Sequence, residues 1–306
     1  MSAGGSGRVA GEVSSWHGGG MSNLPYVLTL VADPDRTTLS NAVLARVRDV
    51  ARAEAPIMLQ PGEAADLFCA APPPMDMVQE ALAGLPVDAV VQQAAGRRKR
   101  LLIADMDSTV VQGETLDELA ALAGVGEQVA AITRRSMNGE LDFAQALRER
   151  VAMLEGQSTA LLELCWKGVV LTSGAAELVQ AMKAQGAVTA LVSGGFTFFT
   201  ERVAATCGFS LHRANVLEHA DGRLTGRVAE PILDRDAKLR TLLALCTEHA
   251  IPIGQTLAVG DGANDMAMIG AAGLGVAFHA KPVVAAMAPA RIQYAGLRAL
   301  RFLQGI

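Results

Sequence analysis

Three strongly apolar runs, each followed at once by polar residues or glycine, are the feature that most constrains the fold of this chain. They are Leu101–Asp105 (LLIAD), Ala187–Gly195 (AVTALVSGG) and Gln255–Gly262 (QTLAVGDG). Continuous apolar strands separated by helical sequence are typical of a parallel sheet that is buried on both faces. Leu274–Phe278 (LGVAF) fits a further strand. We therefore predict an α/β unit with a Rossmann-like parallel sheet in residues 97–306.

A long helical section interrupts this unit between the first two runs. Residues 115–172 are rich in Glu, Ala, Leu and Arg and are too long for a single crossover connection. The sequence therefore predicts an inserted helical cap. Further along, Asp221-Gly222 separates two short alternating segments in NVLEHADGRLTGRV, a pattern that favours a β-hairpin.

A different pattern precedes the α/β unit, in residues 24–93. Strand-like and helix-like segments follow one another there in the order βαββαβ, which is the split pattern of α+β ferredoxin-like domains. The expected strands cover 26–32, 56–60, 64–70 and 86–93, and the expected helices cover 39–53 and 75–84. No ligand signature stands out in this unit. A structural or dimerising role and amino-acid sensing both stay open.

The first residues carry a composition of their own. Residues 1–22 are rich in Gly and Ser and lack the apolar segment of a secretory signal, so we expect a disordered leader. Met21 could be an alternative start, and whether residues 1–20 belong to the native protein stays open.

Composition and charge argue against several classes of function. Hydrophobic residues make up 51% of the 306 residues, while the net charge is -5 and no long basic run occurs, so nucleic-acid binding is not expected. No apolar stretch reaches the length of about 18 residues that a membrane span requires. The four cysteines are widely spaced and favour a reducing, cytoplasmic compartment.

The residues that follow the apolar runs predict the position of a site. Because ligands bind at the carboxyl ends of strands in open parallel sheets, these polar residues should share one crevice. They are Asp105 and Asp107 after the first run, Ser193, Gly194 and Gly195 at the end of the second, and Asp261, Asn264 and Asp265 after the third.

The combination of these groups suggests phosphoryl transfer. Two neighbouring carboxylates repel unless one keeps its proton or a cation such as Mg²⁺ lies between them. Ser193, glycine N–H groups and Lys238 could bind phosphate. One aspartate could attack phosphorus while the other moves protons. Chemistry alone leaves open whether Asp105 or Asp107 attacks, and solvated turns or helix caps remain alternative interpretations of each separate motif.

The same motifs resemble those of a known superfamily, the haloacid dehalogenase-like phosphatases. They are, in order, DMDST (Asp105–Thr109), SGG (Ser193–Gly195), Lys238 and GDGANDMAMI (Gly260–Ile269), and the resemblance covers about residues 97–298. The segments GELDF, LRERVAML and SGGFTFF are also similar to the branch that acts on phosphoserine. Some members carry an amino-acid-binding ferredoxin-like (ACT-like) domain ahead of the phosphatase domain, and residues 24–93 are similar in pattern.

The resemblance implies a role for each matching residue. Asp105 would be the nucleophile and a Mg²⁺ ligand, and Asp107 the general acid/base and a ligand through its backbone carbonyl. In the core, Asp261 would bind the metal, Ser193, Gly194 and Lys238 would bind phosphate, Asn264 would contact the substrate, and Asp265 would support the site. In the cap, Glu114 and Arg150 would recognise the substrate's amino and carboxylate groups. Met137 and Phe143 would close over the substrate.

The implied reaction is Mg²⁺-dependent hydrolysis of O-phospho-L-serine to L-serine and phosphate through an aspartyl phosphate, the last step of serine biosynthesis. A related phosphotransferase that passes phosphate to an acceptor such as homoserine stays open, because acceptor choice lies in the cap. An amino-acid sensor without phosphatase activity is disfavoured by the intact Asp105, Asp107, Lys238 and Asp261. The implied partner is the small-molecule substrate, and a homodimer through the N-terminal domain is left open.

Overall fold

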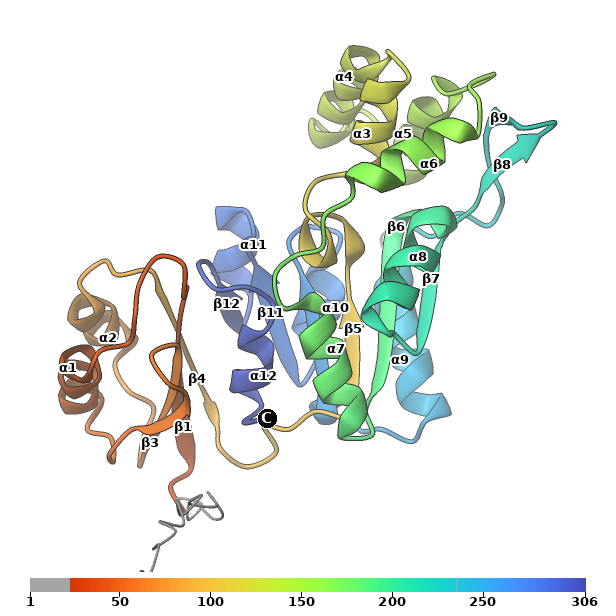
Figure 1. Cartoon of the computed structure of the whole chain (residues 1–306). Helices are drawn as coiled ribbons and strands as arrows, with labels where there is room; N and C mark the ends of the chain where they lie inside the picture. Colours follow the sequence, from red (N-terminus) through yellow and green to blue (C-terminus); the bar gives the residue numbers. More distant parts are fainter. Residues whose placement is uncertain (1–22, 235) are drawn as a thin grey trace, which may run out of the picture.

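Two main sheets organise the chain in the computed structural model, which describes residues 23–234 and 236–306 (Figure 1). One is a four-stranded antiparallel sheet near the N-terminus, and the other is a six-stranded parallel sheet. The predicted fold class, a Rossmann-like core with a helical cap and an N-terminal α+β unit, is confirmed. The leader expected in residues 1–22 lies outside the described residues.

The N-terminal unit has the expected element order. Its elements are β1 (Tyr26–Ala32), α1 (Asn41–Ala51), β2 (Ile57–Gln60), β3 (Ala64–Cys69), α2 (Met75–Leu82) and β4 (Val87–Gln93). The strand order is β2-β3-β1-β4, with every neighbouring pair antiparallel. Side chains alternate across a strand, so Leu28 and Leu30 pack with α1 and α2 while Val31 joins the larger core of the chain.

The parallel sheet contains the predicted apolar runs as neighbouring strands. Its strand order is β12-β11-β10-β5-β6-β7, and every paired strand is parallel. The strands are β5 (Leu101–Ala104), β6 (Val188–Phe196), β7 (Leu211–Asn215), β10 (Thr256–Gly260), β11 (Leu274–Phe278) and β12 (Ala290–Ile292). The central order β10-β5-β6 confirms that the first three runs lie side by side.

Helices cover both faces of this sheet, which explains why its strands are apolar throughout. Leu102 and Ala104 pack in one cluster with α7 (Ala175–Ala184), α8 (Thr197–Cys207) and α12 (Ala299–Leu303). Leu101 and Ile103 pack on the opposite face, in a cluster with α9 (Ala237–Glu248) and α10 (Met266–Ala271). The short helices α11 (Pro282–Met287) and η2 (Ile253–Gln255) complete the core.

The cap stands above the carboxyl ends of the parallel sheet (Figure 1). It consists of α3 (Thr115–Leu122), α4 (Gly126–Met137), α5 (Phe143–Ala152) and α6 (Ala160–Gly168). Its two connections to the core run side by side, because the N–H of Gln112 donates to the Val170 carbonyl and the N–H of Thr172 to the Val110 carbonyl. The cap is therefore attached through a narrow paired hinge.

The predicted hairpin is present, but it starts later than the sequence pattern suggested. It comprises β8 (Leu217–Ala220) and β9 (Arg223–Val228), with Asp221 and Gly222 both at positive φ as a type I′ turn requires. Asn215, which we had placed in the hairpin, is instead the last residue of β7. Figure 1 shows the hairpin reaching from the core to the cap.

The N-terminal unit packs against the C-terminal part of the chain rather than against the cap. Helix α12 contacts β1 and β3, and β12 contacts β4. The buried Asp88 carboxylate on β4 accepts backbone N–H groups from residues 293, 294 and 295, and Arg97 pairs with Asp66 at 2.7 Å. Within the described parts of the chain, none of the helices combines the length and apolar character needed to cross a membrane.

Candidate active site

The carboxyl ends of β10, β5 and β6 bring the predicted polar residues to one place. Asp105 directly follows β5, Asp261 directly follows β10, and Ser193 lies near the end of β6. The strand register sets Ala104 beside both Val259 and Leu191, so the residues that follow these three lie at neighbouring levels of the sheet. The crevice expected from the apolar runs is therefore present.

Asp105 is a buried carboxylate with fixed contacts. Its Oδ1 accepts the N–H of Met106 at 2.7 Å and lies 2.7 Å from Nζ of Lys238. Burial raises the pKa of Asp105 well above its usual value, Asp265 raises it further, and the neighbouring Lys238 opposes both effects. A buried acid beside a buried base is costly to build, and such groups are concentrated at functional sites.

Lys238 reaches the site from the first turn of α9. Its Nζ lies 2.6 Å from Oδ1 of Asp265 as well as 2.7 Å from Oδ1 of Asp105. Burial alone would lower the pKa of Lys238, but the two carboxylates outweigh burial and raise it above its usual value. The lysine therefore stays charged and provides a fixed positive group for an anion.

Three carboxylates form a cluster that suits a hard divalent cation. Oxygen atoms of Asp105, Asp261 and Asp265 lie within 4.8 Å of one another. Burial and the charge of Asp265 raise the pKa of Asp261, so the cluster carries unfavourable charge that a cation would relieve. Carboxylate oxygens are the ligands that Mg²⁺ prefers. The donor set of this chain thus fits a divalent cation.

Asp265 lies deeper in this cluster than the sequence suggested. Helix capping was an open alternative for Asn264 or Asp265, beside the supporting role that the resemblance implies; Asp265 does occupy the N-cap position of α10, but its side chain makes no capping bond. Its carboxylate instead contacts Lys238 and accepts the N–H of Gly262 at 3.0 Å. The residue therefore ties α9 to the loop after β10.

The carboxylate of Asp107 has other partners than that of Asp105. Its Oδ1 accepts the N–H of Thr115 at 2.8 Å, and its Oδ2 accepts the hydroxyl of Ser193 at 3.1 Å. Burial raises the pKa of Asp107, and these hydrogen bonds lower it in part. A Cβ atom on Gly195 would lie 2.9 Å from Oδ2, so only glycine leaves room for this carboxylate. Asp107 is thus a second acid, fixed at the base of the cap.

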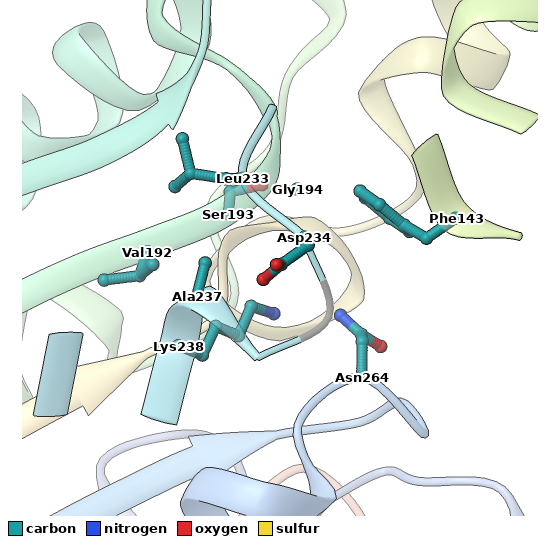
Figure 2. Close-up of a pocket in the computed structure, with 9 residues that line it drawn as sticks. All are labelled: Phe143, Val192, Ser193, Gly194, Leu233, Asp234, Ala237, Lys238 and Asn264. Atoms are coloured by element: carbon teal, nitrogen blue, oxygen red, sulfur yellow. The ribbon is translucent and has the colours of Figure 1, made fainter. Parts of the chain in front are cut away.

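A small hollow lies over the end of β6 (Figure 2). Figure 2 shows Lys238, Asn264 and Phe143 around it, with Phe143 entering from the cap. A Cβ atom on Gly194 would lie 3.0 Å from the Phe143 ring, so the absence of a side chain lets the cap approach the turn. Ser193, Gly194, Lys238 and Asn264 are therefore brought together as the sequence predicted.

Glu114 lies where the first cap connection enters α3. Its Oε1 accepts the hydroxyl of Ser108 at 2.8 Å. Glu114 is exposed as a residue, but the surrounding protein removes water from its carboxyl group. This burial and the nearby charge of Asp107 raise the pKa of Glu114 to about 7. The charge of Asp261 acts in the same direction.

Arg150 is a half-buried cation on α5 that faces the same region. Burial lowers the pKa of Arg150, while the charges of Asp117, Glu114 and Asp107 raise it. Its Nε donates to the Ala146 carbonyl at 3.3 Å. Over the described residues, its guanidinium group has no carboxylate within ion-pairing distance, which leaves it free to bind an anion.

Met137 does not join this group of residues. It is the last residue of α4 and is 70% exposed. Phe143, predicted to act with it, does line the hollow.

Several residues of the site were not identified from the sequence. Ser108, at φ 54°, turns the chain between Asp107 and Glu114, and the backbone of Thr115 holds Asp107. Asp234 lines the hollow, and Asn215 binds the Gly194 carbonyl at 2.8 Å. Ser108 belongs to the DMDST motif, so the sequence could have identified it. Asn215 lies far from the motifs in sequence and only the fold brings it there.

Comparison with known proteins gives one consistent result. Residues 99–273 match the model of the haloacid dehalogenase-like hydrolases. A phosphoserine phosphatase of Streptomyces coelicolor is 43% identical over 226 residues, which cover 73% of this chain and 55% of that relative. This chain thus spans about half the length of that curated relative.

Solved structures agree with this result. A probable phosphoserine phosphatase from Vibrio cholerae, in unliganded form, is 32% identical, with a TM-score of 0.78 over 92% of this chain and 86% of that one. A phospho-aspartyl intermediate analogue of phosphoserine phosphatase is 40% identical, with a TM-score of 0.62 over 67% of this chain and 98% of the other. With the family model covering more than half of its length, this chain belongs to the haloacid dehalogenase-like hydrolases.

Proposed function

We propose that this chain hydrolyses O-phospho-L-serine to L-serine and phosphate through an aspartyl phosphate on Asp105, as the last step of serine biosynthesis. The contact between the buried Asp105 and Lys238 carries the proposal, because it places a nucleophile beside a cation for a phosphoryl oxygen. Relatives named phosphoserine phosphatase support the choice of substrate.

Asp105 is the residue that we assign to the attack. Met106 and Lys238 both contact its Oδ1, so Oδ2 is the oxygen that would form the bond to phosphorus. The bond between phosphorus and the serine oxygen would break as this bond forms. Lys238, Ser193 and the N–H of Gly194 would hold the phosphoryl oxygens during the transfer.

Asp107 is the residue that we assign to proton transfer. Its carboxyl group would donate a proton to the leaving serine oxygen, and the burial that raises the pKa of Asp107 favours the proton-carrying form. The resulting carboxylate would then accept a proton from the water that attacks the aspartyl phosphate. The bonds from Ser193 and Thr115 keep the carboxyl group in position for both steps.

We further propose that the divalent cation is Mg²⁺. The carboxylates of Asp105 and Asp261 and the backbone carbonyl of Asp107 would hold it, with Asp265 supporting the cluster beside Lys238. When bound, Mg²⁺ supplies positive charge to the phosphate oxygens as charge develops on them.

Two residues of the cap are assigned to the amino-acid part of the substrate. The Glu114 carboxylate would pair with the ammonium group, and the Arg150 guanidinium would bind the carboxylate with two parallel hydrogen bonds. Asn264 would contact the substrate from the core, and Phe143 would close over it. Met137, at the exposed end of α4, would reach the substrate only on further closure of the cap.

The test is a comparison of substrates with purified protein and Mg²⁺. We expect turnover of phosphoserine to exceed that of a generic aryl phosphate by far, and Asp105→Asn to lower kcat by at least about a thousandfold. Equal kcat/KM for the two substrates would overturn the substrate assignment. Wild-type turnover in Asp105→Asn would overturn the assignment of the nucleophile.

Partners and location are part of the proposal as well. We propose a cytoplasmic enzyme with a small-molecule substrate, without nucleic-acid or membrane partners. Strand β2 is an edge strand that exposes Ile57 and Met58, which supports a homodimer through the N-terminal unit. Light scattering on Ile57→Lys and wild-type protein would test this, with equal masses overturning the use of β2.

A further inference from the structure

The phosphate-binding turn interrupts the pairing between β6 and β7. The strands pair in register as far as Val192 and Arg213, and the pairing resumes with a shift at Phe196 and Asn215. Residues 193–195 therefore bulge out of the ladder, as expected for a turn that presents N–H groups to a ligand. The side chain of Asn215 compensates for this, because its Nδ2 donates to the Gly194 carbonyl at 2.8 Å.

The same side chain binds a second segment of the site. Its Oδ1 accepts the N–H of Leu233 at 2.8 Å. Leu233 precedes Asp234, whose carboxylate accepts the N–H of Asp236 at 3.0 Å and a guanidinium N–H of Arg240 at 2.8 Å. These bonds form the start of α9, the helix that carries Lys238. Figure 2 shows Leu233 beside Ser193 and Gly194 at the hollow.

The chain between Asn215 and Leu233 contains the hairpin of β8 and β9, and this hairpin contacts the cap. The hairpin there is bonded to cap residues by the N–H of Gly156 to the Leu224 carbonyl at 2.9 Å and the N–H of Leu224 to the Gln157 carbonyl at 2.8 Å. Any movement of the cap therefore pulls on a segment whose two ends lie at the phosphate-binding turn and at α9. Asn215 joins those two ends.

We propose that Asn215 is a positioning residue that keeps the Ser193–Gly194 turn and the start of the Lys238 helix in register while the hairpin moves with the cap. The side chain is buried, at 2% exposure, and an amide can donate to one backbone group while accepting from another. An ionised aspartate could accept but not donate. This inference rests on the proposed function, because the two segments it joins are assigned to phosphate.

The informative variant is Asn215→Asp, which keeps the shape and the acceptor for Leu233 but places a carboxylate against the Gly194 carbonyl. We expect its affinity for inorganic phosphate, measured by calorimetry with Mg²⁺ present, to fall by about tenfold. The KM of phosphoserine should rise similarly, while inhibition by L-serine, whose amino and carboxylate groups we assign to Glu114 and Arg150, should change little. If Asn215→Asp does not fold, Asn215→Ser provides the second variant, with a smaller loss expected.

Thr189→Val is the matched control. Thr189 is fully buried, and its hydroxyl lies 3.2 Å from that of Ser210, so this variant also removes a buried polar contact between β6 and the start of β7. Thr189 lies near the start of β6, whereas the Ser193–Gly194 turn lies near the end of that strand. We expect Thr189→Val to lower the melting temperature as Asn215→Asp does and to leave phosphate affinity unchanged.

Each outcome bears on a different claim. Unchanged phosphate affinity in folded Asn215→Asp, or an equal loss in Thr189→Val, would overturn the positioning role. Wild-type protein that binds phosphate but does not turn over phosphoserine would overturn the substrate assignment alone. Wild-type protein that does not bind phosphate would overturn both.

Discussion

Nζ of Lys238 lies 2.7 Å from Oδ1 of Asp105, and both side chains are almost fully buried. The same Nζ lies 2.6 Å from Oδ1 of Asp265. The lysine thus holds two carboxylates together that would otherwise repel. Removing one partner of a buried ion pair leaves an uncompensated charge, which costs far more than the pair contributes. The stability of the core and the chemistry of the site are therefore linked at this lysine.

We expect Lys238→Met to destabilise the metal-free protein by about 3–5 kcal/mol, because it leaves Asp105 and Asp265 unpaired. Mg²⁺ should then raise the melting temperature of the variant more than that of the wild type, since the cation replaces part of the lost charge. Urea unfolding and melting curves with EDTA or Mg²⁺ would measure both effects. Lys183→Met removes an exposed lysine whose Nζ donates to the Gly208 carbonyl at 2.7 Å, and should leave the unfolding curve nearly unchanged. Equal metal shifts in Lys238→Met and wild type would contradict this account.

Glu114 should make substrate binding depend on pH. Since the pKa of Glu114 is raised to about 7, the free protein carries a partly protonated carboxyl group at neutral pH. An ammonium group pairs with the ionised form, so the KM of phosphoserine should fall between pH 6 and pH 8. Glu114→Gln should lose this part of the dependence and keep the part that comes from titration of the phosphate. A profile that is the same in Glu114→Gln and wild type would rule out this role.

The stability of the free protein should change with pH in the opposite direction. The folded state holds the Glu114 proton more tightly than the unfolded state does, because the pKa of Glu114 is raised from 4.5 to about 7. Its contribution to folding is therefore fully present below about pH 4.5 and is lost as the pH rises through about 7. The difference in unfolding free energy between wild type and Glu114→Gln should decrease over this range.

The position of the site could be predicted from the sequence because strands buried on both faces must be apolar almost throughout. Strands β5, β6, β10 and β11 stand out for this reason, and the polar residues after them mark the carboxyl edge. Strands β7 (LHRAN) and β12 (ARI) did not stand out. They lie at the two edges of the sheet, where polar side chains are tolerated and short strands suffice.

The partners of individual side chains could not be predicted in the same way. Asp265 follows a Gly-rich loop and precedes a helix, so capping was a reasonable local expectation. In the fold its carboxylate lies next to Lys238, and a buried ammonium group competes more strongly for it than a helix end does. The contacts of Asn215 also depend on the fold, because the bulge of β6 interrupts the pairing beside Gly194 and brings the Gly194 carbonyl to the Asn215 side chain.

Arg150→Lys should separate recognition of the substrate from the chemistry. The lysine keeps the charge but cannot form two parallel hydrogen bonds to a carboxylate. We expect the KM of phosphoserine to rise by about 10- to 100-fold, while hydrolysis of an aryl phosphate without a carboxylate stays unchanged. Arg148→Lys is the matched control on the same helix, since Arg148 pairs with the exposed Glu230 at 2.6 Å. A similar rise in both variants would point to a general disturbance of α5.

Gly195→Ala should affect catalysis more than stability. Its Cβ would lie 2.9 Å from Oδ2 of Asp107 and 3.1 Å from Oγ of Ser193, so one of these groups must shift by a few tenths of an ångström. A displaced acid/base transfers protons poorly, and we expect kcat to fall by about 10- to 100-fold with a smaller change in KM. Gly270→Ala provides the control, because it lies in α10 with no atom near its new methyl group and should leave kcat unchanged. If Gly195→Ala kept wild-type kcat, the close packing of Asp107 against the turn would have no catalytic importance.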